Sequence, residues 1–335
     1  MIKKIIVTLI IFFFLLFILF FNKSLVKKVD NNYFNNALTY YIRLIQNKIS
    51  NPYNNDQYDS INYFPVKHNI NYKDLVFFDA KNYFNYNYLD LEIKKNFIFI
   101  GHRSGLVYSF GENNLKTVKF SFNKGFRIFE LDIHLTSDNQ IICFHGFPKD
   151  FIKNPNNFSF SDYKEYIIST NQELCSFDEI LKFANKSGSF LLLDLHSNYE
   201  NIFNHIIENY DQKLFKSLIP QITNFEQLFY FKKNNFFSGP ILTSYGFNNL
   251  STEDLLNIGL KFNLPAITLT RSRIDDLKTK LPEDLMIFTH PVDNLIDAIN
   301  LKIDGIDGIY TKTLDPTNFS ILLKKSTEFN RKFDH

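Results

Sequence analysis

Eight short apolar runs between residues 96 and 312 constrain the fold of this chain more than any other feature. Their near-continuous apolar character is typical of strands buried on both faces, as in parallel sheets. Segments with a helical pattern separate many of them, and this alternation indicates an α/β architecture. Eight such strands predict a (β/α)₈ TIM barrel over residues 95–325. The runs are NFIFIGHR, FRIFELDIH, QIICFHG, SFLLLDLHS, GPILTSYG, PAITLTR, LMIFTHP and DGIDGIYTK.

Residues with capping preferences bound three of the predicted helices. The pattern NLKTVKFSFNKG ends at Gly125, and SFDEILKFANKSG begins with a serine and ends at Gly188. Serine is a preferred N-cap, and glycine is the preferred residue just after a helix. In STEDLLNIGLKF, either Ser251 or Thr252 fits the N-cap. The link LTSDN between the second and third runs is too short for a helix, so we expect an irregular barrel there.

The first 29 residues carry a membrane-anchor signal. An uncharged apolar run of 17 residues extends from Ile5 to Phe21, with lysines on both sides. Roughly 17 to 25 residues span a bilayer, so the run has the minimum length. A cleavable signal peptide has a shorter apolar core followed by small residues, and FFNKSLVKK offers neither. We therefore predict an uncleaved transmembrane helix in residues 1–29. Lys3 and Lys4 in the short tail favour a cytoplasmic N-terminus, which places the barrel on the extracytoplasmic side.

Residues 30–94 are rich in Asn and Tyr and show no motif with catalytic chemistry. We interpret them as a linker or as a cap over the barrel. The net charge of the whole chain is +2, which provides no basic field, and no nucleic-acid-binding motif is present. Nucleic acid is therefore not an expected partner. The sequence gives no indication of oligomeric state.

The chain has two cysteines, Cys143 and Cys175, without CxxC spacing or clustered histidines. A zinc site is thus poorly supported. The apolar run IICF favours a buried hydrophobic role for Cys143. Two cysteines neither require nor exclude a disulfide.

Two acidic residues, Glu130 and Asp132, interrupt the second apolar run in FELDIHL. Side chains two apart on a strand share a face, so these carboxylates project side by side while their apolar neighbours face the other way. Asp194 in LLLDLHS repeats the alternation, and we expect the three carboxylates to converge at one end of the barrel. Such a cluster is costly without a cation, and its oxygens suit Ca²⁺ or Mg²⁺. An ion pair with Arg103 or Arg271 is the alternative.

Polar residues gather at the predicted C-terminal ends of the strands, where TIM barrels form their active sites. His102 and His145 among them can supply a general acid and a general base around one metal ion. The set consists of His102, Arg103, Glu130, Asp132, His145, Asp194, His196, Ser244, Arg271 and His290.

Several segments resemble one known family. FIGHRSG and GENNLKTVKFSFNKGFRIFELDIHLTSDNQIICFHG are similar to the opening of the glycerophosphodiester phosphodiesterases, which are metal-dependent TIM-barrel enzymes. FSFSDYKEYI, LCSFDEILKFANKSGSFLLLDLHS and KIDGIDGIYTKTLDP are similar to later family motifs, in the same order. The resemblance covers about residues 96–316.

The resemblance implies a phosphodiesterase that hydrolyses glycerophosphodiesters or phospholipid-derived head groups with a divalent cation, Ca²⁺ or Mg²⁺, and the apolar run from Ile5 to Phe21 adds a membrane anchor. Its expected partners are a small-molecule phosphodiester and the membrane. The implied site consists of the acid–base pair His102 and His145, the phosphate-binding Arg103, the metal ligands Glu130, Asp132 and Asp194, and the substrate contacts His196 and Phe288.

Several positions depart from the family pattern, among them His290 and Pro291 in the strand with Phe288. Asp194 replaces a Glu, His196 a Lys, Gly146 the Asp of an HD pair, and Ser104 the Gly of HRG. These departures leave two alternatives open. One is a catalytically silent barrel that binds a phosphorylated lipid or envelope component. The other is a metal-free, phospholipase-C-like lyase that uses the two histidines and the arginine.

Overall fold

Eight parallel strands close into a barrel, as the sequence predicts. The computed structural model describes residues 97–107, 110–145, 158–170, 172–195, 199–234, 237–275, 277 and 281–321. Neighbouring strands pair in the order β1, β9, β8, β7, β6, β5, β4, β2, and a β1–β2 pairing closes the ring. The barrel strands are β1 (Ile98–Gly101), β2 (Ile128–Leu135), β4 (Phe190–Leu195), β5 (Leu218–Ile222), β6 (Ile241–Thr243), β7 (Ala266–Thr270), β8 (Met286–His290) and β9 (Gly308–Thr311).

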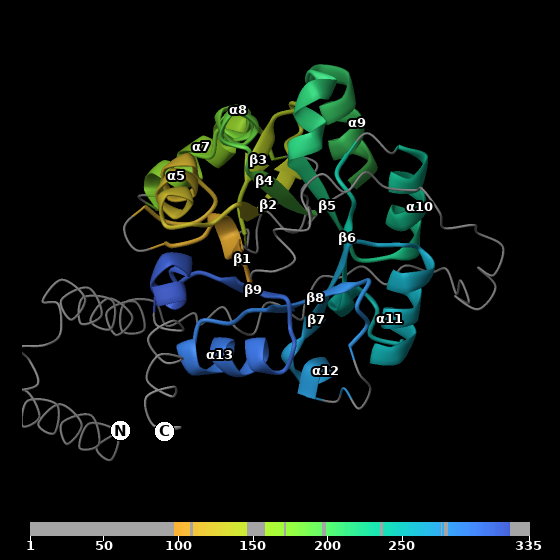
Figure 1. Cartoon of the computed structure of the whole chain (residues 1–335). Coiled ribbons are helices and arrows are strands. Elements are labelled where there is room, and N and C mark those ends of the chain that lie inside the picture. The colour runs from red at the N-terminus through yellow and green to blue at the C-terminus, as the bar shows by residue number, and fades with distance from the viewer. Residues whose placement is uncertain are drawn as a thin grey trace, which may run out of the picture. The chain divides into compact units, whose positions relative to one another are not determined.

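Helices lie around the outside of these strands (Figure 1). Gly125 and Gly188 adopt positive φ angles of 100° and 71° after their helices, as predicted. Ser251 is the N-cap of α11, in a capping box with Asp254. The helices are α5 (Leu115–Asn123), α7 (Phe160–Ser169), α8 (Phe177–Ser187), α9 (Tyr199–Asn209), α10 (Phe225–Lys233), α11 (Thr252–Lys261), α12 (Arg271–Asp275) and α13 (Leu295–Ile303), with 3₁₀ turns η3 (His102–Ser104), η5 (Gln212–Ser217) and η6 (Ser244–Gly246).

The strand assignment differs from the prediction at two places. The run QIICFHG forms β3 (Ile141–Cys143), which pairs antiparallel with β2 and lies outside the ring of eight. The short link before β3 explains this, because a parallel connection needs a dozen or more residues. The missing barrel strand is β5, with the sequence LIPQI. This strand was not predicted because it contains Pro220 and Gln221, and a proline inside an apolar run argues against a strand.

Apolar side chains fill the barrel and also join it to the helices. On β2, Leu131 and Ile133 belong to the large outer core between strands and helices. Residues of the opposite parity face inward, and Glu130 and Asp132 therefore share the inner face with Ile128. A plug of apolar residues fills the inside: Ile98, Ile100, Ile128, Leu192, Ile219, Ile241, Ala266, Met286, Phe288 and Tyr310.

A disulfide joins Cys143, at the end of β3, to Cys175, two residues before α8. The two cysteines, whose pairing the sequence left open, are thus bonded to each other. Among the described residues, no helix is long and apolar enough to cross a bilayer. The predicted anchor in residues 1–29 and the linker or cap in residues 30–94 lie outside the described part of the chain.

Candidate active site

Three carboxylates converge inside the barrel at the end where β2 and β4 finish. Asp132 pairs with Asp194 in the register of these strands, and Glu130 lies two residues earlier on β2. All three side chains are buried. One oxygen from each lies within 4.8 Å of the others. The convergence predicted from the alternation of β2 and β4 is therefore present.

This acidic triad fits a hard divalent cation. Burial, with the like charges of Asp132 and Asp194, raises the pKa of Glu130 well above its usual value. Three buried carboxylates thus need a positive charge to ionise together. Two oxygens on opposite sides of one Ca²⁺ are about 4.6–5.2 Å apart, which accommodates the observed spacing. A donor set of oxygens alone favours Mg²⁺ or Ca²⁺ over softer metals. The triad can therefore hold a divalent metal ion.

A tight turn at the end of β1 brings the backbone to this triad. Within η3, Arg103 and Ser104 have positive φ angles of 50° and 75°. The turn needs glycine on both sides, because a Cβ at Gly101 would lie 2.9 Å from the Cα of Gly105 and a Cβ at Gly105, where φ is 104°, would lie 2.5 Å from Oγ of Ser121. As a result, the backbone N–H of Arg103 donates a hydrogen bond to Oε2 of Glu130. Ser104, which stands where the HRG pattern has glycine, adopts this left-handed backbone conformation although it carries a side chain.

The side chain of Arg103 links the triad to a histidine. Its Nη2 lies 2.7 Å from Nε2 of His145. Because a guanidinium has no acceptor, the arginine donates and the imidazole accepts. Its Nε lies 3.9 Å from Oδ2 of Asp132. The alternative ion pair with Arg271 is absent from the described contacts of the triad, since Arg271 forms an exposed ion pair with Asp275 at 3.0 Å.

His102 lies buried beside this group. Its Nε2 is 3.0 Å from Nε2 of His290, which ends β8. Its Nδ1 is buried and has no hydrogen-bond partner among the described residues. Burial is the largest cause that lowers the pKa of His102 well below its usual value, and the charges of His290, Lys312 and Arg103 act in the same direction. The imidazole is therefore neutral near pH 7, the state in which it can accept a proton.

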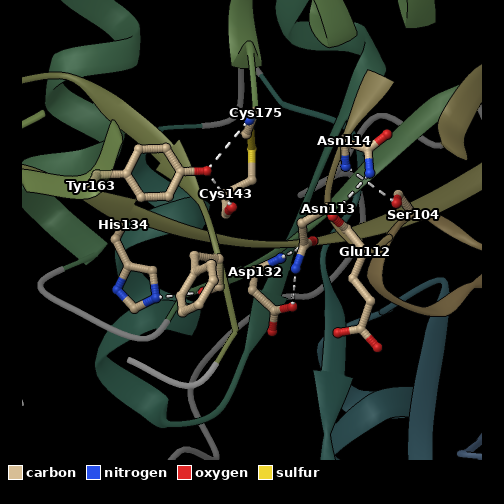
Figure 2. The surroundings of a disulfide bond; sticks show 10 residues. Ser104, Glu112, Asn113, Asn114, Asp132, His134, Cys143, Tyr163 and Cys175 are labelled. Carbon is tan, nitrogen blue, oxygen red and sulfur yellow. Dashed lines mark hydrogen bonds between the residues drawn. A yellow bond between two sulfur atoms is a disulfide. The ribbon is translucent and has the colours of Figure 1, made fainter. Parts of the chain in front are cut away.

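Asn113, which was not among the predicted site residues, orients Asp132 of the triad. Asn113 has a φ of 53°, a conformation that asparagine adopts more readily than most residues. Its Nδ2 donates to Oδ2 of Asp132 at 2.8 Å, and its Oδ1 accepts from the backbone N–H of Asp132 at 3.2 Å. Figure 2 shows these bonds, with the carboxylates of Asp132 and Glu112 pointing the same way below Asn113. The feature of the sequence that could have indicated this residue is the Asn pair in GENN, just before α5.

Two further charged residues, Glu112 and Lys312, belong to the site, and they meet because β9 pairs with β1 when the barrel closes. Glu112 receives Lys312 on Oε1 at 2.7 Å and Arg103 on Oε2 at 3.3 Å. Partial burial opposes ionisation of Glu112, whose side chain is 36% exposed, but these two cations prevail and lower its pKa. Sequence spacing could not reveal this pair, because Glu112 and Lys312 are 200 residues apart.

A hydrogen-bonded network holds the end of β3, just before His145. The hydroxyl of Tyr163 donates to the carbonyl of Cys143 at 3.0 Å and accepts from the backbone N–H of Cys175 at 3.4 Å. Nε2 of His134 lies 2.9 Å from the carbonyl of Phe144. These contacts surround the disulfide (Figure 2). They fix the backbone from which His145 reaches Arg103.

Two predicted substrate contacts remain, Phe288 and His196. Phe288 is fully buried in the apolar plug inside the barrel, two residues before His290 on β8. His196 lies outside the described residues. The structure therefore brings together both predicted histidines, the arginine and the triad, while substrate contacts by Phe288 and His196 stay predictions.

Comparison with known proteins identifies the barrel type. No protein-family model matches the chain, and no curated protein matches it. Among solved structures, a glycerophosphodiester phosphodiesterase from Parabacteroides distasonis is similar at a TM-score of 0.55 and 18% identity, over 69% of this chain and 98% of that one. The enzyme of the same name from Thermotoga maritima is similar at 0.53 and 16%, over 68% and 98%. The chain has the fold of these phosphodiesterases. At such low identity the likeness concerns the fold, and the chemistry rests on the site.

Proposed function

We propose that this protein is a metal-dependent phosphodiesterase that hydrolyses glycerophosphodiesters or related phospholipid-derived phosphodiesters. One observation carries the proposal: a buried acidic triad able to hold a divalent ion lies against Arg103, which itself contacts His145 and follows His102 in the chain. A cation and a guanidinium can stabilise the charge that develops on the phosphate, and two imidazoles can serve as general base and general acid. The shared fold with glycerophosphodiester phosphodiesterases supports this substrate class.

Each residue has a defined task in this proposal. Glu130, Asp132 and Asp194 would hold Mg²⁺ or Ca²⁺, which supplies Lewis-acid polarisation of a phosphoryl oxygen. Arg103 offers a planar set of donors to the phosphate. His102, neutral and buried, accepts the proton of the attacking water. His145 would protonate the leaving alkoxide from its protonated form, in which Nε2 no longer accepts the hydrogen bond of Arg103.

A membrane location is part of the same proposal. The apolar run from Ile5 to Phe21 supports an anchor, and the disulfide Cys143–Cys175 supports an extracytoplasmic barrel. Disulfides persist in oxidising compartments and are rare in the cytosol. An anchored enzyme would meet substrates released at the membrane surface.

The test is hydrolysis of glycerophosphocholine and glycerophosphoethanolamine by the full chain in detergent, with Mg²⁺, with Ca²⁺ and with chelator. We expect metal-dependent turnover, which Asp132→Asn abolishes. His102→Ala and His145→Ala are each expected to lower kcat by roughly 10²-fold or more, the scale of acid–base catalysis.

Matched controls are Asp178→Asn, on the exposed face of α8, and His205→Ala, on α9. Both should retain wild-type turnover. Activity that survives the chelator would instead indicate the metal-free lyase. No turnover by a folded protein, together with binding of phosphorylated lipid, would indicate the silent barrel.

A further inference from the structure

Barrel closure places a lysine beside the candidate catalytic residues. In the pairing of β1 with β9, Gly101 lies opposite Thr311. His102 and Lys312 directly follow these two partners, so they leave adjacent strands at the same end of the barrel. The Lys312 side chain is only 19% exposed. A lysine so nearly buried is rare unless it has a partner or a function.

The partner of Lys312 is already shared with another cation. Glu112 binds Lys312 through Oε1 and Arg103 through Oε2. One negative charge therefore faces two positive charges. A second carboxylate, Asp132, lies 3.9 Å from Arg103, but it belongs to the acidic triad that a divalent ion would occupy. In this count of charges, one further negative charge next to the two cations would balance them.

A phosphodiester matches this requirement. It carries one negative charge, and further charge develops on its non-bridging oxygens during hydrolysis. The field of Lys312 also reaches the buried imidazole of His102, where it contributes to the lowered pKa. The ammonium group thus lies near the place where the proton is transferred.

We propose that Lys312 is a substrate-binding residue, whose ammonium group binds a non-bridging phosphate oxygen together with Arg103. Glu112 is the positioning residue that holds both cations toward the site. This inference rests on the proposed function, since it assigns a second cation to the same phosphate. It adds a residue that directly follows β9 and lies 200 residues from Glu112 in the sequence.

The experiment compares Lys312→Met and Lys312→Arg with the wild-type full chain. Calorimetric titration of inorganic phosphate in the presence of Mg²⁺ measures anion binding without turnover. Kinetics with glycerophosphocholine measure KM and kcat. A charged hydrogen bond lost to the phosphate predicts roughly ten- to a hundredfold weaker phosphate binding and a similar loss in kcat/KM for Lys312→Met. Lys312→Arg should recover most of both.

Lys302→Met is the matched control, because this exposed lysine of α13 lies over the Phe97 ring, 5.7 Å from its centroid. It should bind phosphate like the wild type. Lys312→Gln keeps a neutral donor for Glu112 and serves as a second neutral variant if Lys312→Met unfolds. Wild-type phosphate affinity in either folded neutral variant would overturn the proposal, as would a wild-type protein that binds no phosphate. A wild type that binds phosphate but cleaves no diester would contradict the proposed function alone.

Discussion

At the scale of single residues, a proton and a metal ion compete for Glu130. Its pKa is raised above the usual value of 4.5 by burial and by Asp132 and Asp194. In the metal-free protein, the resulting stabilisation is fully present below pH 4.5 and is lost as the pH rises through the folded-state pKa. Metal binding displaces the proton, so its affinity rises over the same interval.

We therefore predict that Mg²⁺ or Ca²⁺ binds more tightly as the pH is raised above 4.5, the usual pKa of the carboxyl group. The melting temperature of the metal-free protein should fall over this range, and saturating metal should offset the fall. Calorimetry at several pH values and thermal unfolding measure the two effects. Glu130→Gln is the control, since it removes the titrating group and should flatten both profiles. Metal affinity that is independent of pH in the wild type would contradict the prediction.

Residue patterns also set the limit of what the sequence could predict about the site. Alternation on β2 placed Glu130 and Asp132 on the inner face, because the side-chain period of a strand is fixed at two. Asn113 lies only 19 residues from Asp132, yet its contact depends on a left-handed backbone that no periodicity encodes. Lys312 approaches Glu112 only because β9 pairs with β1 when the barrel closes. Tertiary closure, not local pattern, supplies these missing residues.

At the scale of elements, the barrel strands were predictable where no proline lies inside the strand. Eight runs indicated eight strands, but β3 is an antiparallel addition and β5 takes the eighth place in the barrel. In β5, Pro220 lies opposite Leu193 of β4. Proline has no backbone N–H to donate to a neighbouring strand, so its presence argued against a strand at this position, although the strand forms. Helix ends were predictable because Gly125, Gly188 and Ser251 act through local backbone geometry alone.

The junction between β3, α7 and α8 carries a prediction at this scale. Tyr163→Phe removes the hydroxyl that satisfies the carbonyl of Cys143 and the N–H of Cys175. Because both groups are buried, we expect the free energy of unfolding to fall by about 1–3 kcal/mol. Urea denaturation measures the change. Tyr230→Phe is the control, because its hydroxyl binds the exposed Asn204 and should matter less. Equal losses in the two variants would contradict the junction's importance.

At the scale of the whole molecule, the disulfide bears on the stability of the fold and on the compartment in which the protein can keep that stability. Cys143 and Cys175 are 32 residues apart, and the bond closes the segment that contains His145 and α7. Cross-linking restricts the unfolded chain, and a loop of this length contributes about 3–4 kcal/mol in the chain-entropy account. This stabilisation is available only where the bond persists, which is outside the reducing cytosol.

We predict that the double variant Cys143→Ala/Cys175→Ala loses about 2–4 kcal/mol of unfolding free energy in urea denaturation, and that reductant lowers the stability of the wild type by a similar amount. Reductant should leave the double variant unchanged, which provides the control. Thiol labelling before and after reduction, followed by mass spectrometry of protein isolated from native membranes, tests the location. Both cysteines labelled before reduction would contradict an extracytoplasmic barrel, since an oxidising compartment leaves neither thiol available. Protection of both until reduction would support the anchor orientation that Lys3 and Lys4 favour.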